Sequence, residues 1–548
     1  MARLRVSAAW QRLDDAQRHA TAYPQPLTRT GSLQFVVCCP QNLLFLTREL
    51  TIDNELDQPD SGRSRGNAGS LLALLVFIAL LFAPLGGLSP EAHRLAAIMG
   101  AVVILWITEA LPLPVTAIMG AVACVLLRVA PARDVFAPFA DPLMFLFIGS
   151  FILARAIMLH GLDRRVAYAV LSLRVVGSSP TRILFAFGAV TAAISAWISN
   201  TATTAMMFAI GMAILAFMRD AAKREGRRLD PRYATALMLM TSFAASVGGL
   251  ATPIGTPPNV IGLGFIRQLT GTELPFFKWM LLGVPTVIIM LLAVFFVLGR
   301  AARSVNAGVG ESAGMLEREH ERRGSWSTAE KSTVVAFSVT VFLWILPGVF
   351  ALIYGDSSPQ YTALTARIPE GVAALVGACL LFVLPGDQQG KVITWREAAK
   401  IDWGIVLLYG GGFALGVLSF RTGLAETMGR GVLEYLPASG ETGLLIASTI
   451  MAVILSETTS NTASANMIVP VVISVAVAAG VDPVVPALGA TFGASMGFML
   501  PVSTPCNAIV YGSGYIPLRT MMTYGVMVDI VGVIVIVTVL KFLLPLVR

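Results

Sequence analysis

The tripeptide Ser-Asn-Thr occurs twice in this chain, at residues 199–201 and 460–462, each time within a long apolar stretch. Serine, asparagine and threonine side chains hydrogen-bond to nearby backbone and therefore favour helix ends over helix interiors. A helix that breaks at such a point exposes carbonyl groups at one new end and N–H groups at the other. Carbonyl and amide oxygens suit a hard cation such as Na⁺, whereas N–H groups, hydroxyls and the positive end of a helix dipole suit an anion. Each tripeptide could therefore help to bind a salt.

Two further features accompany each tripeptide. A glycine-bearing segment precedes it, beginning at Asp141 in the first copy and at Asp402 in the second, and a Thr-Pro-x-Asn element follows it, at 256–259 and at 504–507. The three features recur in the same order, at offsets of 261, 261 and 248 residues. This pattern predicts an internal duplication. The offsets leave open whether the copies are parallel or inverted, and inversion is the commoner arrangement among transporters with matched broken helices.

The segments that begin at Asp141 and Asp402 each continue through an apolar run to a Gly-Leu pair, at 161–162 and 423–424, with arginine nearby. We interpret each as a re-entrant hairpin. The alternative is a plain spanning helix. For the tripeptides, the alternative is polar contact between packed helices, which duplication makes less attractive.

The composition assigns the chain to the polytopic membrane proteins. Hydrophobic residues make up 56% of the sequence and charged residues 13%, and the mean hydropathy is +0.76. A soluble globule could not bury that much apolar surface. The apolar runs have the length of helices, and the alternating strands of a membrane barrel are missing. These runs cover roughly 70–88, 94–110, 115–130, 181–217, 233–250, 277–299, 332–354, 370–385, 441–479, 484–500 and 521–547.

The net charge of +7 does not indicate nucleic-acid binding, because the basic residues lie in loops between apolar runs. The basic loop 219–232 is expected in the cytoplasm. The five cysteines show no disulfide or metal spacing.

Charged side chains are scarce around the tripeptides. Residues 183–217 and 233–266 contain none, and residues 443–516 contain only Glu457 and Asp482. An anion bound here must be balanced by helix ends, hydroxyl groups and bound cations, which would couple anion binding to cation binding. Glu457 could carry a proton or could be a carboxyl satisfied at a helix end, and we favour the structural role.

At these residues the chain resembles the divalent anion/sodium symporter family, which includes bacterial dicarboxylate transporters and mammalian sodium-coupled citrate, dicarboxylate and sulfate carriers. The resemblance runs from about residue 70 to the C-terminus. It is carried by the paired Ser-Asn-Thr tripeptides, the Thr-Pro-Pro-Asn element at 256–259, and the run 500–505 that leads to Asn507-Ala-Ile-Val. It implies an all-α polytopic fold with about eleven transmembrane helices, two re-entrant hairpins, an inverted repeat, and scaffold and transport domains in a homodimer that works as an elevator.

The resemblance also implies a domain division. We expect a polar, disordered N-terminal tail over 1–67, scaffold helices over 68–140, a first transport-domain repeat over 141–276, scaffold helices over 277–401 with a polar loop at 300–331, a second transport-domain repeat over 402–520, and a C-terminal helix over 521–548.

The family's binding residues can be carried over through the matching motifs. The first sodium site would comprise Ser195, Ser199, Asn200 and Gly255. The second would comprise Ser456, Thr459, Asn461 and Ser503. The anion would be bound by Asn200, Thr201, Asn461 and Thr462, with Pro257, Thr504 and Pro505 shaping the wall. The second copy departs from the family pattern at Cys506, where proline is usual, and at Ser503, where alanine is frequent.

The sequence thus predicts a sodium-coupled symporter of the inner or plasma membrane that imports C4-dicarboxylates such as succinate, malate and fumarate, with Na⁺ as coupling ion and no other cofactor. Sulfate or citrate transport within the same family, and a proton-coupled anion transporter of a related family, remain alternatives. A channel fits paired helix breaks less well. An enzyme is disfavoured, because none of the four histidines begins a His-Glu-x-x-His motif.

Overall fold

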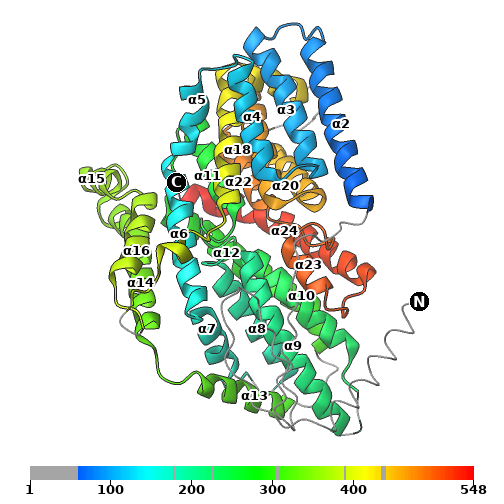
Figure 1. Ribbon diagram of the computed structural model, residues 1–548, viewed down its shortest axis with the longest axis vertical. Helices are drawn as coiled ribbons and strands as arrows, with labels where there is room; N and C mark the ends of the chain where they lie inside the picture. Colours follow the sequence, from blue (N-terminus) through cyan, green and yellow to red (C-terminus); the bar gives the residue numbers. More distant parts are fainter. Residues whose placement is uncertain are drawn as a thin grey trace, which may run out of the picture. The chain divides into compact units, whose positions relative to one another are not determined.

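The computed structural model describes residues 60–547 except 174, 177–178, 225, 227, 303–308, 388–389 and 434–439. The chain divides after Arg63 into two units, and nearly all described residues belong to the second, Ser64–Arg548. Most of the described residues are helical, and none of them forms a β-strand (Figure 1). The predicted tail lies largely outside the described residues, although a helix already begins at Asp60.

Within the described residues, four α-helices and one 3-10 helix precede the segment that begins at Asp141. They are α2 (Asp60–Phe82), α3 (Pro90–Thr108), α4 (Leu113–Leu126), α5 (Ala132–Phe136) and η1 (Ala137–Ala140). Helix α3 begins where it does because the Ser89 hydroxyl accepts a hydrogen bond from the Ala92 N–H, at 3.1 Å, and Pro90, which has no N–H group, needs no acceptor in the first turn.

The first half, residues 141–302, forms seven helices among its described residues. They are α6 (Pro142–Leu159), α7 (Leu162–Leu171), α8 (Pro180–Ser195), α9 (Asn200–Arg224), α10 (Pro231–Gly248), α11 (Pro257–Thr270) and α12 (Phe276–Ala302). Asp141 caps α6, accepting from the Leu143 N–H at 2.9 Å. The chain turns into α7 at Gly161, whose φ of 68° is the left-handed conformation that glycine tolerates.

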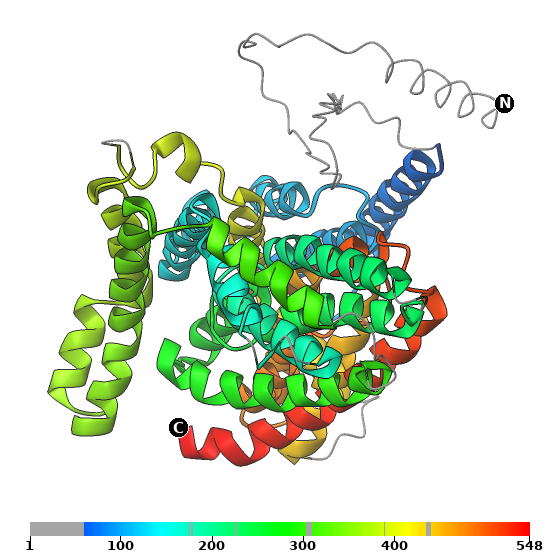
Figure 2. The same cartoon turned by 90° about the horizontal axis from the view of Figure 1, so that it is seen from below.

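Among the described residues between the two halves, five helices connect them. They are α13 (Val309–Arg322), α14 (Thr328–Tyr354), α15 (Pro359–Arg367), α16 (Glu370–Val383) and α17 (Trp395–Ala398). A capping box formed by Ser327 and Glu330 starts α14. Helices α14 to α16 stand together at one edge, with α16 packed against α6 (Figures 1 and 2).

The second half, residues 402–547, repeats the helix order of the first. Its helices are α18 (Trp403–Arg421), α19 (Leu424–Leu433), α20 (Gly440–Thr458), α21 (Asn461–Ala478), α22 (Val484–Gly493), α23 (Pro505–Tyr511) and α24 (Leu518–Val547). Asp402 caps α18 by accepting from the Ile405 N–H at 3.2 Å, and the turn into α19 falls at Gly423, with φ 80°. Both predicted hairpin segments are therefore a capped helix, a glycine turn and a shorter helix.

The two halves interlock. Helix α11 of the first half packs against α21 and α22 of the second, while α23 of the second half packs against α9 and α10 of the first. Their side chains share one hydrophobic core. Trp279 of α12 stacks on Phe492 of α22, for example, with ring centroids 4.7 Å apart. Each Thr-Pro-x-Asn element thus starts a helix that packs against the opposite half.

Nine helices within the described residues are long and apolar enough to cross a membrane, or ten if the bent pair α15 and α16 forms one span. Four shorter apolar helices accompany them. Large apolar side chains are exposed along α12, α14 and α24, for example Phe296, Phe342 and Ile534, as expected of surfaces that face lipid. The protein is a multi-pass membrane protein. The count of about eleven spans, the inverted relation of the halves and the re-entrant path of α6 and α18 stay predictions.

Candidate cation and anion site

The first Ser-Asn-Thr tripeptide breaks a helix, as predicted. Helix α8 ends at Ser195 and α9 begins at Asn200. The Ser199 hydroxyl accepts a hydrogen bond from the Ala202 N–H at 3.3 Å and so caps α9. The break turns the start of α9 toward the surface, because Ser199 and Thr201 are exposed and Asn200 is half-buried.

Oxygen atoms converge on the Asn200 amide. One terminal atom of the Asn200 amide points inward and lies 2.8 Å from Ser195 Oγ, 3.1 Å from the Ala245 carbonyl oxygen and 3.3 Å from the Gly255 carbonyl oxygen. When this atom is the amide nitrogen, it donates hydrogen bonds to all three oxygens, which is the orientation that satisfies the most hydrogen bonds. The structure therefore brings together three of the four residues predicted for the first sodium site and adds Ala245. Ser199 serves as the helix cap.

The second tripeptide is built in the same way. Helix α20 ends at Thr458, α21 begins at Asn461, and the Ser460 hydroxyl accepts from the Ala463 N–H at 3.2 Å. Ser456 Oγ lies 2.8 Å from Asn461 Oδ1, matching the distance between Ser195 and Asn200. The Ser456 hydroxyl also lies 2.8 Å from the Ala494 carbonyl oxygen.

The other two residues predicted for the second sodium site have partners of their own. Ser503 Oγ lies 3.0 Å from the Glu457 carbonyl oxygen and 2.6 Å from Glu457 Oε2. Thr459 Oγ1 contacts Ser464 Oγ at 2.8 Å and the Leu455 carbonyl oxygen at 2.9 Å. Ser503 therefore stays close to Ser456 through the adjoining Glu457, while Thr459 contacts α20 and α21.

Two asparagines that we did not assign to the site hold in place the loop between α10 and α11 and the loop between α22 and α23. Asn259 Nδ2 donates to the carbonyl oxygens of Gly249 and Thr252, at 2.9 and 2.8 Å. Asn507 Nδ2 donates to those of Gly497 and Leu500, at 2.9 Å each. In both copies the partners lie ten and seven residues before the asparagine. The repeated Thr-Pro-x-Asn element was the sequence signal for this role.

Glycines let these loops approach the tripeptides. A Cβ atom at Gly249 would lie 2.4 Å from the Asn200 side chain, and one at Gly497 would lie 3.3 Å from Asn461 Oδ1. There is therefore no space for a side chain at Gly249, whereas at Gly497 a methyl group would need only a small shift of its neighbours.

Residues of both halves meet at α23. The Ser242 hydroxyl of α10 donates to Asn507 Oδ1 at 2.6 Å. The Cys506 thiol lies beside the hydroxyl groups of Thr201, Thr204 and Ser246. Cys506 thus joins the second Thr-Pro-x-Asn element to the first tripeptide.

The remaining residues predicted to bind the anion lie at helix starts. Thr201 and Thr462 occupy the first turns of α9 and α21, Pro257 and Pro505 are the first residues of α11 and α23, and Thr504 caps α23 by accepting from the Asn507 N–H at 3.1 Å. Pro505 is exposed, Thr462 and Pro257 are half-buried, and Thr504 is buried. A cavity of about 280 Å³ beside Arg267, Glu273 and Glu370 lies away from these residues.

The nearest arginine along α11 is already paired. Arg267 forms an ion pair with Asp141, at 2.5 Å, and so ties the end of α11 to the start of α6. The guanidinium group of Arg267 therefore already has a carboxylate partner.

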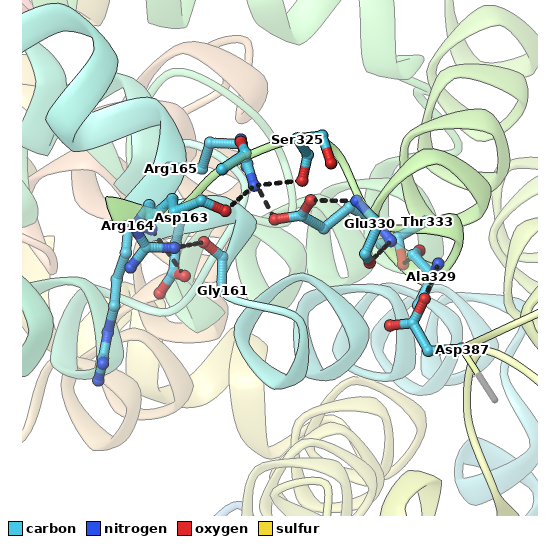
Figure 3. A network of polar contacts seen from close by, with 12 residues as sticks. Gly161, Asp163, Arg164, Arg165, Ser325, Ala329, Glu330, Thr333 and Asp387 are labelled. Atoms are coloured by element: carbon cyan, nitrogen blue, oxygen red, sulfur yellow. Dashed lines mark hydrogen bonds and ion pairs between the residues drawn. The ribbon is translucent and has the colours of Figure 1, made fainter. Parts of the chain in front are cut away.

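A buried polar network anchors the first hairpin segment (Figure 3). Arg165 of α7 donates to Glu330 of α14 at 2.8 Å, and to the carbonyl oxygen of Gly324 at 3.1 Å. Arg323 donates to the carbonyl oxygen of Gly161 at 3.0 Å, at the turn itself. Burial raises the pKa of Asp163, although the Arg164 N–H donates to it at 2.8 Å.

Comparison with known proteins gives the class of this protein. Residues 66–547 match the family described as the sodium:sulfate symporter transmembrane region. The chain belongs to this family of membrane transporters, which confirms the resemblance seen in the sequence.

Its relatives include two staphylococcal proteins named sodium-dependent dicarboxylate transporter SdcS. The protein of Staphylococcus saprophyticus is 33% identical over 497 residues, covering 87% of this chain and 92% of the relative. That of Staphylococcus aureus is 32% identical over 491 residues, covering 88% and 92%. The crystal structure of the Alcanivorax borkumensis YdaH transporter, described as having an unusual topology, is similar with a TM-score of 0.48 at 12% identity, covering 88% of this chain and 98% of that one.

Proposed function

We propose that this protein is a secondary active symporter that imports a small divalent anion together with Na⁺, and that the anion is a C4-dicarboxylate such as succinate, malate or fumarate. The observation that carries the proposal is the pair of oxygen clusters around Asn200 and Asn461, built alike on two interlocking halves. The identity of the ion and of the substrate is supported by the names of the staphylococcal relatives.

The oxygen atoms around the Asn200 amide would be the ligands of a bound cation. Rotating the side-chain amide by half a turn would place an amide oxygen beside the Ser195 hydroxyl and the carbonyl oxygens of Ala245 and Gly255. Neutral oxygens of this kind suit a hard monovalent cation. Ser456 and Asn461 would play the same part in the second site, with Ser503 close by.

The anion would lie between the two clusters, against the starts of α9 and α21. The N–H groups at these helix starts and the side chains of Thr201 and Thr462 would bind its carboxylates. Bound cations would then supply the positive charge that the surrounding sequence lacks. The anion would bind tightly only when the cations are present, and this linkage is the basis of coupled transport.

We further propose that residues 141–276 and 402–520 move as a transport domain past a scaffold, in a homodimer of the inner or plasma membrane, and that the protein is not an enzyme. Helix α6 of the proposed transport domain packs closely against α16 of the proposed scaffold, so this contact lies at their proposed boundary. A Cβ atom at Gly149 would lie 2.6 Å from the Ala374 carbonyl carbon, and one at Gly371 would lie 2.4 Å from the Pro142 carbonyl oxygen.

Uptake of radiolabelled succinate into proteoliposomes tests the proposal. We expect an inward Na⁺ gradient to drive uptake and unlabelled succinate to compete better than citrate or sulfate. Better competition by sulfate would favour the activity in the family's description. Uptake driven by a proton gradient without Na⁺ would contradict sodium coupling.

Asparagine variants test the site. Asn200→Ala or Asn461→Ala removes the central ligand of one cluster, so we expect each to lower sodium-driven uptake at least about a hundredfold, since a lost ligand weakens both cation and coupled anion binding. Asn466→Ala is a matched control, because Asn466 lies on α21 and donates only to the Thr462 carbonyl oxygen of its own helix, at 2.9 Å. Unimpaired uptake by both site variants would contradict the assignment.

A further inference from the structure

Thr252 is a buried residue in the loop between α10 and α11, three residues before Gly255. Only 1% of the residue is exposed. Its hydroxyl group donates a hydrogen bond to the carbonyl oxygen of Ala196, at 2.5 Å. Ala196 directly follows Ser195, where α8 ends at the break made by the first tripeptide. The hydroxyl group of Thr252 thus connects this loop to the helix break.

The carbonyl group of Ala196 needs such a partner. It lies just beyond the last turn of α8, where carbonyl groups lose their intrahelical donors. Among the described residues, no backbone N–H group donates to it. Ala196 is buried, so without the threonine hydroxyl a polar group would be left unpaired inside the protein. The bond therefore stabilises the position of the chain at the break.

The carbonyl group of Thr252 connects the same residue to the other side of the cluster. Its oxygen accepts from the Gly255 N–H at 3.3 Å and from Asn259 Nδ2 at 2.8 Å. The first of these bonds closes the turn that carries Gly255, whose own carbonyl oxygen lies 3.3 Å from the inward amide atom of Asn200. Thr252 therefore links two residues predicted for the first sodium site, Gly255 through its carbonyl group and Ser195 through its hydroxyl group.

The second half closes the same turn with a residue that has no hydroxyl group. The Ser503 N–H donates to the Leu500 carbonyl oxygen at 3.2 Å, and Asn507 Nδ2 donates to the same oxygen at 2.9 Å. Leu500 thus takes the place of Thr252 in the turn. Its side chain cannot donate a hydrogen bond, so the second helix break must be connected to its loop in another way.

Glu457 makes this connection in the second half. The N–H groups of Phe498 and Met499 donate to its Oε1 atom, at 2.5 and 2.8 Å. Ser503 Oγ lies 2.6 Å from its Oε2 atom and 3.0 Å from its carbonyl oxygen. The side chain of Glu457 therefore reaches from the end of α20 to the loop and binds it at three residues.

The two connections substitute for one another. Ala196 and Glu457 occupy matching places, each directly after the serine that contacts the asparagine of its cluster. The alanine methyl group cannot form hydrogen bonds, so in the first half the bond comes from the loop, through Thr252. The first cluster thus depends on one hydroxyl group where the second uses a longer side chain.

We propose that Thr252 is a positioning residue of the first cation site, and that its hydroxyl group holds the end of α8 against the loop so that Ser195 Oγ and the Gly255 carbonyl oxygen can bind the cation together. This inference rests on the proposed function. Thr252 acts through these two ligands, in the way that residues behind a metal site orient the groups that touch the metal. Loss of such a residue weakens cation binding more than it slows transport at saturating cation.

Removal of the hydroxyl group tests this role. Thr252→Val keeps the shape of the side chain and leaves the Ala196 carbonyl oxygen unpaired. We expect it to raise half-saturating Na⁺ for succinate uptake about tenfold or more, with less than about a twofold change in the maximal rate. Thr252→Ser keeps the donor, so half-saturating Na⁺ should stay within about twofold of the unsubstituted value.

Thr286→Val is the matched control. Thr286 of α12 is also 1% exposed, and its hydroxyl group donates to the Leu282 carbonyl oxygen of its own helix, at 2.7 Å. We expect this variant to leave half-saturating Na⁺ within about twofold of the unsubstituted value. If Thr252→Val leaves half-saturating Na⁺ unchanged, or if Thr252→Ser or Thr286→Val raises it as much as Thr252→Val does, the bond to Ala196 does not position the site and the proposal is overturned.

Hydrogen–deuterium exchange without Na⁺ tests the connection separately from transport. Loss of the bond frees the break and the turn, so Thr252→Val should exchange faster than the unsubstituted protein over 196–199 and 252–256, and Thr286→Val should not. Equal exchange in Thr252→Val and the unsubstituted protein overturns the proposal.

Two further arms keep the outcome clear. If Thr252→Val fails to fold, Thr252→Ala and Thr252→Ser differ only in the hydroxyl group, and the same two measurements on this pair decide. Succinate uptake that ignores Na⁺ in the unsubstituted protein refutes the proposed function instead, while hydrogen exchange continues to report on the bond between Thr252 and Ala196.

Discussion

Single residues set the geometry of the two oxygen clusters, and the clusters differ in how much room they leave. Asn259 and Asn507 hold the loops with two hydrogen bonds each to buried backbone. Gly249 and Gly497 then let the loops reach the tripeptides. The two halves have matching hydrogen bonds, but they differ in the space around these two glycines. A pair of equivalent substitutions can test this difference.

Gly249→Ala and Gly497→Ala form such a pair. The new methyl group would lie 2.4 Å from the Asn200 side chain in the first case and 3.3 Å from Asn461 Oδ1 in the second. The first distance forces Asn200 out of place, while the second needs a shift of a few tenths of an ångström. We expect Gly249→Ala to reduce sodium-driven succinate uptake at least about tenfold and Gly497→Ala to reduce it less than about threefold. Equal losses would contradict the difference in clearance.

The helix elements show what could be predicted from the sequence and what could not. The breaks at 199–201 and 460–462 were predictable because short polar side chains favour helix ends. Asp141 and Asp402 cap helices for the same reason. The offsets between the motifs indicate their order along the chain but not which helices pack together. The packing of α11 and α23 against opposite halves was therefore not predicted. The part played by the Ala245 carbonyl group could not be predicted from the sequence, because every residue has a backbone carbonyl group.

The anchoring of α7 to α14 depends on one buried ion pair. The side chains of Arg165 and Glu330 are 9% and 7% exposed. Arg165→Met leaves the Glu330 charge uncompensated, so we expect it to lower the free energy of unfolding by about 3–5 kcal/mol. Arg165→Met combined with Glu330→Gln should cost less, because the charge is removed and the amide still accepts at the start of α14. Arg322→Met, at an exposed pair with Glu319, should change it by less than about 1 kcal/mol. Thermal unfolding of the purified variants measures all three.

The contact between α6 and α17 should depend on pH. Hydrogen bonds from Lys400 and Arg155 lower the pKa of Glu397 from its ordinary value of 4.5 to about 2. Because the folded-state pKa is depressed, the carboxylate stabilises the fold above pH 4.5, and this contribution is lost as the pH falls toward 2.

Glu397→Gln provides the comparison for this contact. The difference in unfolding temperature between the unsubstituted protein and this variant should be constant above about pH 5 and should shrink below it. A difference that grows on acidification would contradict the assigned direction.

At the scale of the whole molecule, the proposed site takes residues from both interlocked halves, so cation and anion should stabilise the fold jointly. A ligand that binds only the folded state at about 100 times its dissociation constant adds about 2.7 kcal/mol of stability. We expect succinate to raise the unfolding temperature in NaCl and to leave it unchanged in choline chloride, because the sequence around the tripeptides has no lysine or arginine that could replace Na⁺. Asn461→Ala should abolish the succinate effect in NaCl. Equal stabilisation by succinate in choline chloride would show that the anion binds without sodium, and the coupling scheme would then fail at its first step.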